Sequence, residues 1–289
     1  MIETLQSLPP GDVLAVRGLV AAVTTADGVA PLSEQSLLHL EDSTAGAQHL
    51  LLRQDSSVAG YAQLEADGSA ELMIDPLHRR QGHGRALLEA VAAQSGTGLR
   101  VWAHGDGAGA RALASQLGYE RSRVLLQLRR GLSGELPEAV WPPDVTVRTF
   151  EPGRDEAAWL AVNAAAFATH PEQGQWRLSD LQQREQQEWF DPKGFFLAEH
   201  DGELVGFHWT KIHREETPPI GEVYVVGVHP AAGGKGLGRA LTLEGLHHLR
   251  SSGMTDVLLY VDESNVAAMK TYERLGFTRW ATDVMYSRA

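Results

Sequence analysis

The sequence contains one pattern twice, and this repetition limits the possible folds more than any other feature. Residues 75–87 and 229–241 both run from a proline through a glycine-rich stretch to Gly-Arg-Ala-Leu, with Gly84 and Gly238 separated by 154 residues. Two shorter pairs of segments also match, residues 58–61 with 204–207 and residues 117–119 with 275–277. Because the three matches come in the same order, we interpret them as a duplicated domain.

A domain boundary is expected where the two copies meet. The 289 residues suit two domains of ordinary size, each able to bury a core. Residues 131–144 are rich in proline and glycine and have no periodicity, which is typical of a linker. We therefore expect an N-terminal domain over residues 1–130 and a C-terminal domain over residues 145–289.

Hydrophobic periodicity and turn signals predict the elements of the second copy. Strands are expected over residues 194–200, 203–211, 222–228 and 257–261, and helices over residues 239–250 and 267–275. Asp201-Gly202, between the first two strands, is a strong hairpin signal. This order predicts an α/β protein of the α+β type, with a mixed sheet and helices on its faces.

Composition excludes several classes of function. The chain has no cysteine, which excludes disulfides, cysteine-based zinc sites and an acyl-cysteine intermediate. The 12 histidines show no metal-ligand spacing, so we expect no metal. A net charge of -12 argues against nucleic acid or an anionic membrane as the partner. With no signal peptide and no membrane-length apolar run, we expect a cytoplasmic monomer that acts on a small molecule.

The glycine-rich loop of the second copy, residues 233–238, carries the first chemical signal. Successive glycines let several backbone N–H groups point into one concavity, and the following helix adds the positive end of its dipole. Together these features suit a pyrophosphate. The loop has no Gly-Lys-Ser/Thr ending, which excludes a P-loop, and it follows a third strand, which disfavours a Rossmann site.

The pattern Arg-x-x-Gly-x-Gly at residues 79–84 resembles the acyl-coenzyme A loop of the GNAT N-acetyltransferase superfamily. The second copy departs from this pattern, because Gly233 stands where arginine or glutamine is usual. Downstream, the order Asn, Tyr and Gly-Phe within residues 265–277 resembles the later acetyltransferase motif. The resemblance implies two tandem GNAT-like domains and acetyl-coenzyme A as the co-substrate.

The two copies differ at the positions that direct acetyl transfer needs. Glu222, beside the loop in the strand, is a candidate general base, and Tyr272 lies where the superfamily often places the proton donor to the thiolate. In the first copy the repeat offsets put Gly68 and Ala114 at these two positions. Asn265 likewise corresponds to Gly107. We therefore expect the first copy to be non-catalytic.

Three runs give a narrower resemblance, to the actinobacterial mycothiol synthase family: residues 166–174, 208–211 and 222–228. It implies transfer of acetyl from acetyl-coenzyme A to the cysteinyl amine of a cysteinyl-glucosaminyl-inositol, the last step of mycothiol biosynthesis. The implied substrate contacts are Glu34, Glu172, Lys211, Glu222 and Tyr260. The implied coenzyme contacts of the second copy are Val226, Gly227, Val228, Gly233, Gly234, Lys235, Gly236, Leu237, Gly238, Arg239, Asn265, Val266, Ala267, Ala268, Met269 and Lys270. Those of the first copy are Leu72, Met73, Ile74, Arg80, Gln81, Gly82, His83, Gly84 and Arg85.

Other interpretations stay open from the sequence. A tandem acetyltransferase for an antibiotic, polyamine or peptide amine would share every motif, and a silent acyl-coenzyme A sensor would share the loops. Individually, Glu172 could be a solvated loop residue, Lys211 an exposed strand end and Tyr260 a cross-strand aromatic.

Overall fold

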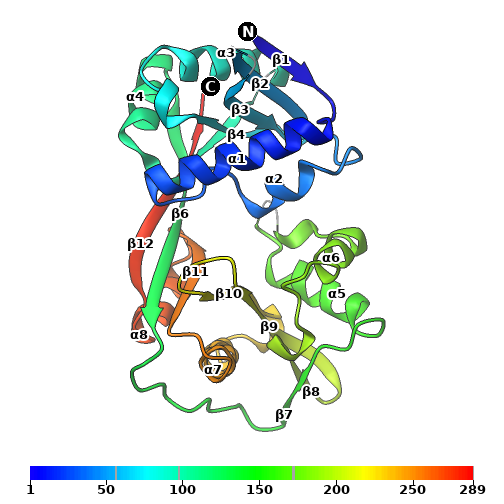
Figure 1. The fold of residues 1–289 in the computed structure, drawn as a ribbon. Helices are drawn as coiled ribbons and strands as arrows, with labels where there is room; N and C mark the ends of the chain where they lie inside the picture. Colours follow the sequence, from blue (N-terminus) through cyan, green and yellow to red (C-terminus); the bar gives the residue numbers. More distant parts are fainter. Residues whose placement is uncertain (56, 97, 171–172, 289) are drawn as a thin grey trace. The chain divides into compact units, whose positions relative to one another are not determined.

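A computed structural model of the chain describes residues 1–55, 57–96, 98–170 and 173–288 (Figure 1). It divides the chain into two compact units. Unit 1 contains Met1–Leu126, Asp262–Asn265 and Ala281–Ala289, and unit 2 contains Gln127–Val261 and Val266–Trp280. In each unit, parallel and antiparallel strands pair and helices cover both faces of them, which confirms the predicted fold class.

Unit 1 is built from a sheet in the strand order β1-β2-β3-β4-β5, followed by parts of β12 and β6. Its strands are β1 (Ile2–Leu5), β2 (Gln48–Gln54), β3 (Ser57–Leu64), β4 (Ser69–Ile74), β5 (Arg100–Ala103), β6 (Glu120–Gly131) and β12 (Thr278–Ser287). Its helices are α1 (Pro10–Asp27), α2 (Glu34–His39), α3 (His83–Ser95) and α4 (Ala108–Leu117). Strands β4 and β5 are parallel, whereas β1 to β4 pair antiparallel.

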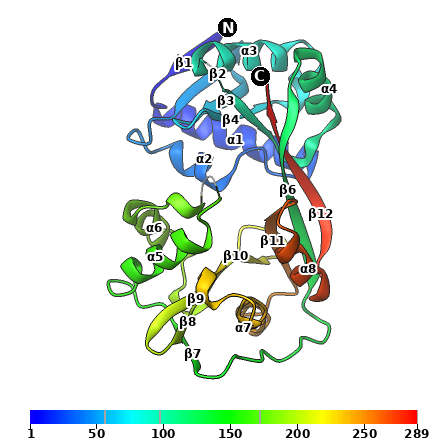
Figure 2. The same cartoon turned by 180° about the vertical axis from the view of Figure 1, so that it is seen from behind.

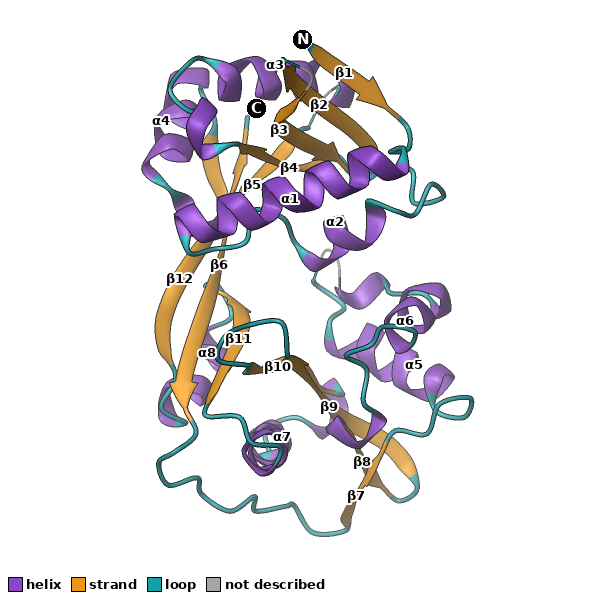
Figure 3. Ribbon diagram, viewed as in Figure 1, coloured by secondary structure: helices purple, strands orange, loops and turns teal. Residues whose placement is uncertain are grey.

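Alternation along the strands of unit 1 separates two hydrophobic layers. Leu50 and Leu52 of β2 pack with α3 and α4, while Leu51 between them packs with α1. Helix α1 lies across the strands in Figure 3. Because neighbouring side chains of a strand point to opposite faces, β2 is buried on both sides and reads as a continuous apolar run.

Most of the last strand of the chain, β12, belongs to unit 1, from Ala281 onward. Residues Val284, Met285, Tyr286 and Ser287 of β12 pair antiparallel with β5. By its contacts, the structure thus assigns residues 281–289 to unit 1, whereas the sequence repeat places them in the second copy. Between β6 and β7 the segment 132–144, within the expected linker, has no helix or strand.

Unit 2 has the strand order β11-β10-β9-β8-β7, with β6 next to β11 (Figure 2). Its other strands are β7 (Val145–Thr149), β8 (Phe195–His200), β9 (Glu203–His213), β10 (Ile220–Val228) and β11 (Asp256–Asp262). Its helices are α5 (Glu156–Ala166), α6 (Leu178–Glu185), α7 (Leu237–Ser251) and α8 (Val266–Arg274). All six elements predicted for the second copy are confirmed in type and order.

An aromatic core fills one face of the sheet in unit 2. Trp159 of α5 and Trp209 of β9 are fully buried, and the Trp209 ring stacks on Phe195 with centroids 4.5 Å apart. Helix α7 covers the other face through Leu237 and Leu241. These two layers hold β9 and β10 rigidly between them. Within the described part of the chain, no helix combines the length and apolar character of a membrane span.

Candidate active site

In unit 2, the neighbouring strands β10 and β11 separate next to the candidate base, Glu222. Strand β10 pairs in parallel with β11 from Gly221 to Val223, and the ladder ends there. On its other side β10 pairs with β9, but Thr210 faces Val223 whereas Trp209 faces Val225. Tyr224 is therefore the extra residue of a β-bulge, which bends β10 where its ladder with β11 ends. Beyond it, Val226, Gly227 and Val228 pair with β9 alone.

The glycine loop leads from β10 into α7. Gly234 and Gly236 have φ angles of 79° and 82°, which residues with a side chain rarely adopt. Gly236 is the N-cap of α7 and no side chain caps the helix, so its first N–H groups, from Leu237, Gly238 and Arg239, are suited to bind an anion. This geometry fits the pyrophosphate of a coenzyme.

The loop of unit 1 has the same design. Gly82 has a φ angle of 86° and is the N-cap of α3, again with no side-chain cap, and His83 is the first helical residue. The parallel ladder between β4 and β5 likewise ends at Glu71, so Leu72, Met73 and Ile74 lie beyond it. The Arg79 side chain is paired with Asp27 at 2.7 Å, and Arg85 with Glu89 at 3.5 Å.

Glu222 of β10 and Lys211 of β9 are direct cross-strand partners. The next pair of partners toward the bulge is Val223 and Thr210. Glu222 and Lys211 are both buried, with 6% and 8% of their surfaces exposed. Lys211 is thus not an exposed strand end. A buried carboxylate and a buried ammonium need compensating partners.

His213 binds Glu222 directly. Its Nε2 lies 2.7 Å from Glu222 Oε2, and its Nδ1 lies 3.2 Å from Glu215 Oε1. Burial alone would lower the pKa of His213, but the hydrogen bond and negative charge of Glu222 outweigh it and raise that pKa above its usual value. The imidazole therefore gains its proton more readily than an exposed histidine would.

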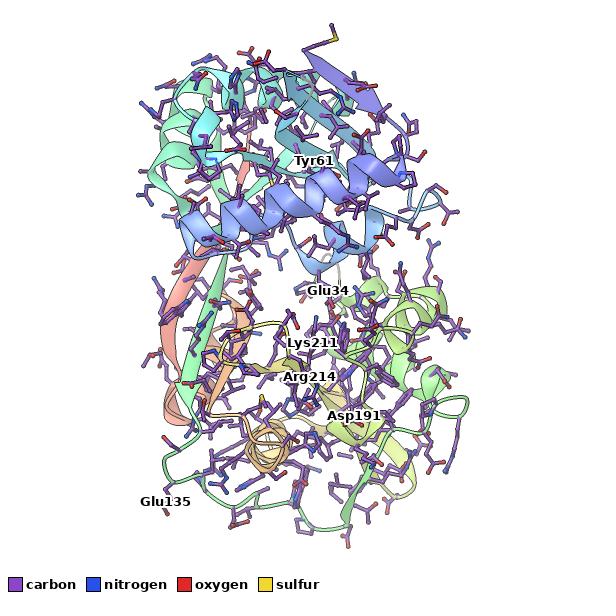
Figure 4. All side chains as sticks on the ribbon, viewed as in Figure 1. Glu34, Tyr61, Glu135, Asp191, Lys211 and Arg214 are labelled. Carbon is purple, nitrogen blue, oxygen red and sulfur yellow. The ribbon has the colours of Figure 1, made fainter. Side chains whose placement is uncertain are left out.

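Aromatic rings surround the Lys211 ammonium. Its Nζ lies 4.4 Å from the centroid of Trp189 and 5.5 Å from that of Tyr224 (Figure 4 labels Lys211). Arg184 Nε donates a hydrogen bond of 2.7 Å to the Tyr224 hydroxyl and its guanidinium lies over Trp176. These contacts fix the ring of the bulge residue and, through it, the wall of the site.

Tyr272 lies on α8 and is buried, with its ring 5.7 Å from Phe277. Burial raises the pKa of its hydroxyl to about 12. The phenol therefore keeps its proton at neutral pH, as a proton donor must.

The remaining expected contacts are spread over both units. Tyr260 on β11 is 45% exposed and its hydroxyl accepts a hydrogen bond of 2.9 Å from Gln127 Nε2. Glu34 is the first residue of α2 in unit 1, and Glu172 lies outside the described residues. Asn265 precedes α8 and belongs to unit 1, whereas Val266 to Lys270 form the first turns of α8 in unit 2.

Unit 1 lacks the bulge. Strand β3 pairs with β4 without a register shift, and Glu65 N donates to Ser69 O where unit 2 pairs Lys211 with Glu222. Ser69 is thus the counterpart of Glu222, and the expectation of Gly68 is wrong by one residue because Tyr224 adds a residue to β10. Ser69 also cannot serve as a carboxylate base.

The end of helix α4 repeats that of α8. Tyr119 N donates to Ala114 O as Phe277 N donates to Tyr272 O, so Ala114 is the counterpart of Tyr272. Unit 1 therefore keeps the loop geometry without the two candidate proton-transfer groups.

Two features of the site were not found from the sequence. His213 was outside the predicted strand, which ended at Lys211, although alternation places residues 211 and 213 on one face. The bulge at Tyr224 has no sequence signal, since it depends on pairing with β9. Among the described residues, no group of three or more histidine, aspartate or glutamate side chains is placed to hold a metal ion.

Family models match both halves of the chain. The Acetyltransferase (GNAT) family matches residues 159–277, and the Acetyltransferase (GNAT) domain matches residues 45–121. The Thermomonospora curvata protein named "Mycothiol acetyltransferase" is 58% identical over 94% of this chain and 92% of its own length. The protein of the same name from Thermobispora bispora is 56% identical over 96% of this chain and 97% of its own.

Solved structures agree on the fold. The GCN5-related N-acetyltransferase from Sphaerobacter thermophilus has a TM-score of 0.72 and 25% identity, over 99% of this chain and 95% of that one. A "Tandem GNAT protein from the clavulanic acid biosynthesis pathway" has a TM-score of 0.74 at 20% identity, over 99% and 98%. With both halves matched and full-length relatives above 50% identity, the chain belongs to the mycothiol acetyltransferase family of tandem GNAT proteins and is an N-acetyltransferase.

Proposed function

We propose that this enzyme moves acetyl from acetyl-coenzyme A to the cysteinyl amine of a cysteinyl-glucosaminyl-inositol, which would make it the last enzyme of mycothiol biosynthesis. The observation that carries the proposal is the buried Lys211–Glu222 pair, positioned where β10 bends and leaves β11. The names of the full-length relatives support the choice of substrate.

The coenzyme would bind in unit 2 along β10 and at the start of α7. Val226 to Val228 lie beyond the parallel ladder, and the first turn of α7 offers uncapped N–H groups to the pyrophosphate. When bound, the coenzyme supplies the acetyl group as an activated thioester. We assign unit 1 the same loop without catalysis, because Ser69 and Ala114 replace the two proton-transfer residues.

In this mechanism Glu222 takes a proton from the substrate ammonium. The nitrogen lone pair then forms the new bond to the acetyl carbon while the carbon–sulfur bond breaks. Tyr272 donates its hydroxyl proton to the departing sulfur. The nitrogen loses two protons in all, the sulfur gains one, and one proton is released. Glu34, Glu172, Lys211 and Tyr260 are proposed to hold the substrate, with carboxylates for its ammonium and hydroxyl groups.

The direct test is acetylation of the desacetyl precursor by the purified full-length protein. Since the substrate itself carries a thiol, the product should be followed by mass spectrometry rather than by thiol release. We expect turnover with this precursor and much slower reaction with aminoglycoside, polyamine and peptide amines. Faster turnover of one of those amines would reassign the substrate, and no turnover with any amine would indicate an acyl-coenzyme A sensor.

Two variants test the assignment of the units. Glu222→Gln should lower kcat by about 10²-fold or more, whereas Arg85→Ala in the loop of unit 1 should leave it nearly unchanged. The opposite pattern would place catalysis in unit 1.

A further inference from the structure

His213 has carboxylates on both sides of its ring. Nε2 faces Glu222 Oε2 at 2.7 Å and Nδ1 faces Glu215 Oε1 at 3.2 Å. An ionised carboxylate only accepts hydrogen bonds, so both ring nitrogens must donate. The ring that meets this requirement is the doubly protonated, positively charged imidazolium.

This ion pair spans the boundary between the interior and the solvent. The Glu222 side chain is 8% exposed, that of His213 is 21% exposed and that of Glu215 is 70% exposed. Burying a carboxylate costs free energy unless nearby donors or cations compensate for its lost hydration. The more exposed His213 provides such a donor to Glu222.

A general base needs the oxygen that takes the proton to point at the substrate, and this contact supplies that orientation. The Nε2–H bond engages Oε2 and so leaves Oε1 as the oxygen for the ammonium. The arrangement resembles a catalytic triad, in which a residue that does not touch the substrate orients the general base that does.

We propose that His213 is a positioning residue for the reaction, an imidazolium anchored by Glu215 that holds Oε2 of Glu222 and aims its second oxygen at the substrate amine. This rests on the proposed role of Glu222 as the base. His213 does not touch the reacting atoms and takes up no proton during turnover.

The charges around the ring have opposite effects on it. Glu222 on β10 and Glu215 after β9 favour the imidazolium, while Lys211, two residues earlier on β9, opposes it (Lys211 is labelled in Figure 4). The carboxylates outweigh burial and Lys211, so the pKa of His213 is raised. Activity should therefore fall as the pH rises through this pKa and the ring loses one donor.

The test is a double-mutant cycle on the full-length enzyme with the desacetyl precursor. His213→Gln keeps a neutral donor and should lower kcat by about 10-fold or more, with KM for acetyl-coenzyme A unchanged. In a Glu222→Gln background the same change should have no further effect, because His213 acts only through Glu222. The matched control is His200→Gln, which removes an exposed histidine 3.3 Å from Asp201 and should keep the wild-type rate.

Added imidazole gives a second measurement. It should restore part of the activity of His213→Ala, and more so at pH 6 than at pH 8, because the cation is the active form. Equal loss from His213→Gln in both backgrounds, a wild-type rate for His213→Gln, or no rescue by imidazole would overturn the proposal. A wild-type rate for Glu222→Gln would overturn the base and the positioning role together, whereas failure of the wild-type enzyme to acetylate the precursor would overturn the proposed substrate.

Discussion

A buried ion triad in unit 1 leads to a quantitative prediction about stability. His104 Nε2 lies 3.0 Å from Glu71 Oε1, and its Nδ1 lies 3.2 Å from Asp283 Oδ2. Burial would lower the pKa of His104, but the charges and hydrogen bonds of Glu71 and Asp283 raise it to about 10. Glu71 also accepts a 2.8 Å hydrogen bond from Ser33 N, at the N-cap of α2.

The pH is the variable to change, and proton linkage gives the size of its effect on the free energy of unfolding of unit 1. A histidine pKa that rises from its ordinary 6.5 to about 10 on folding corresponds to about 5 kcal/mol. The folded unit binds one proton more than the unfolded chain between these values. The stabilisation is therefore complete below pH 6.5 and is lost as the pH rises toward 10, by about 1.4 kcal/mol for each pH unit.

The assay is urea-dependent hydrogen exchange read by mass spectrometry in peptides from β4 and β5, which reports on unit 1 alone. His104→Gln should lower the stability of unit 1 by about 3–5 kcal/mol at pH 7, because two buried carboxylates lose their cation. The same substitution should also make the stability of unit 1 depend less on pH between pH 7 and 9. His83→Gln, whose ring lies 3.3 Å from the Gln54 amide, is the control and should keep the wild-type slope. An unchanged slope in His104→Gln would refute the reasoning.

Three further outcomes are expected. Glu222→Gln should lower kcat by about 10²-fold or more, and a loss below about threefold in steady-state assays would remove it as the base. Tyr272→Phe should lower kcat by about 10²-fold with KM for acetyl-coenzyme A unaltered; a normal kcat would assign the proton donor elsewhere. Gly245→Ala should destabilise unit 2 by about 1–3 kcal/mol, because the new Cβ would lie 2.0 Å from Cε1 of the fully buried His208. Gly18→Ala in α1, where a Cβ meets nothing within 4 Å, should instead stabilise unit 1 by about 0.5–1 kcal/mol. Unfolding temperatures that shift in the same direction in both glycine variants would contradict this contrast.

The hairpin and the glycine loops could be predicted from sequence because their signals are local. Asp201 and Gly202 both have positive φ angles, as the Asp-Gly pair predicts, and Gly236 adopts the φ angle that the loop requires. The counterpart of Glu222 was misplaced by one residue because the bulge depends on how β9 pairs with β10.

His213 was missed for a different reason. Its importance comes from a contact with a residue nine positions later on another strand, and only the extension of β9 beyond Lys211 brings it there. The assignment of most of β12, from Ala281 onward, to unit 1 also lay beyond a repeat-based argument, since the repeat records ancestry and not contacts.

The place of β12 has a consequence for biosynthesis. A ribosome releases residues 1–126 long before it releases residues 281–288, yet β5 finds its antiparallel partner, and His104 its Asp283, only in that last segment. The nascent first half would carry an unpaired strand edge, and His104 would have only Glu71 as a partner, until synthesis ends. Unit 1 is therefore expected to mature last although it is made first, and a frameshift or a fusion near the C-terminus should damage unit 1 before it affects unit 2.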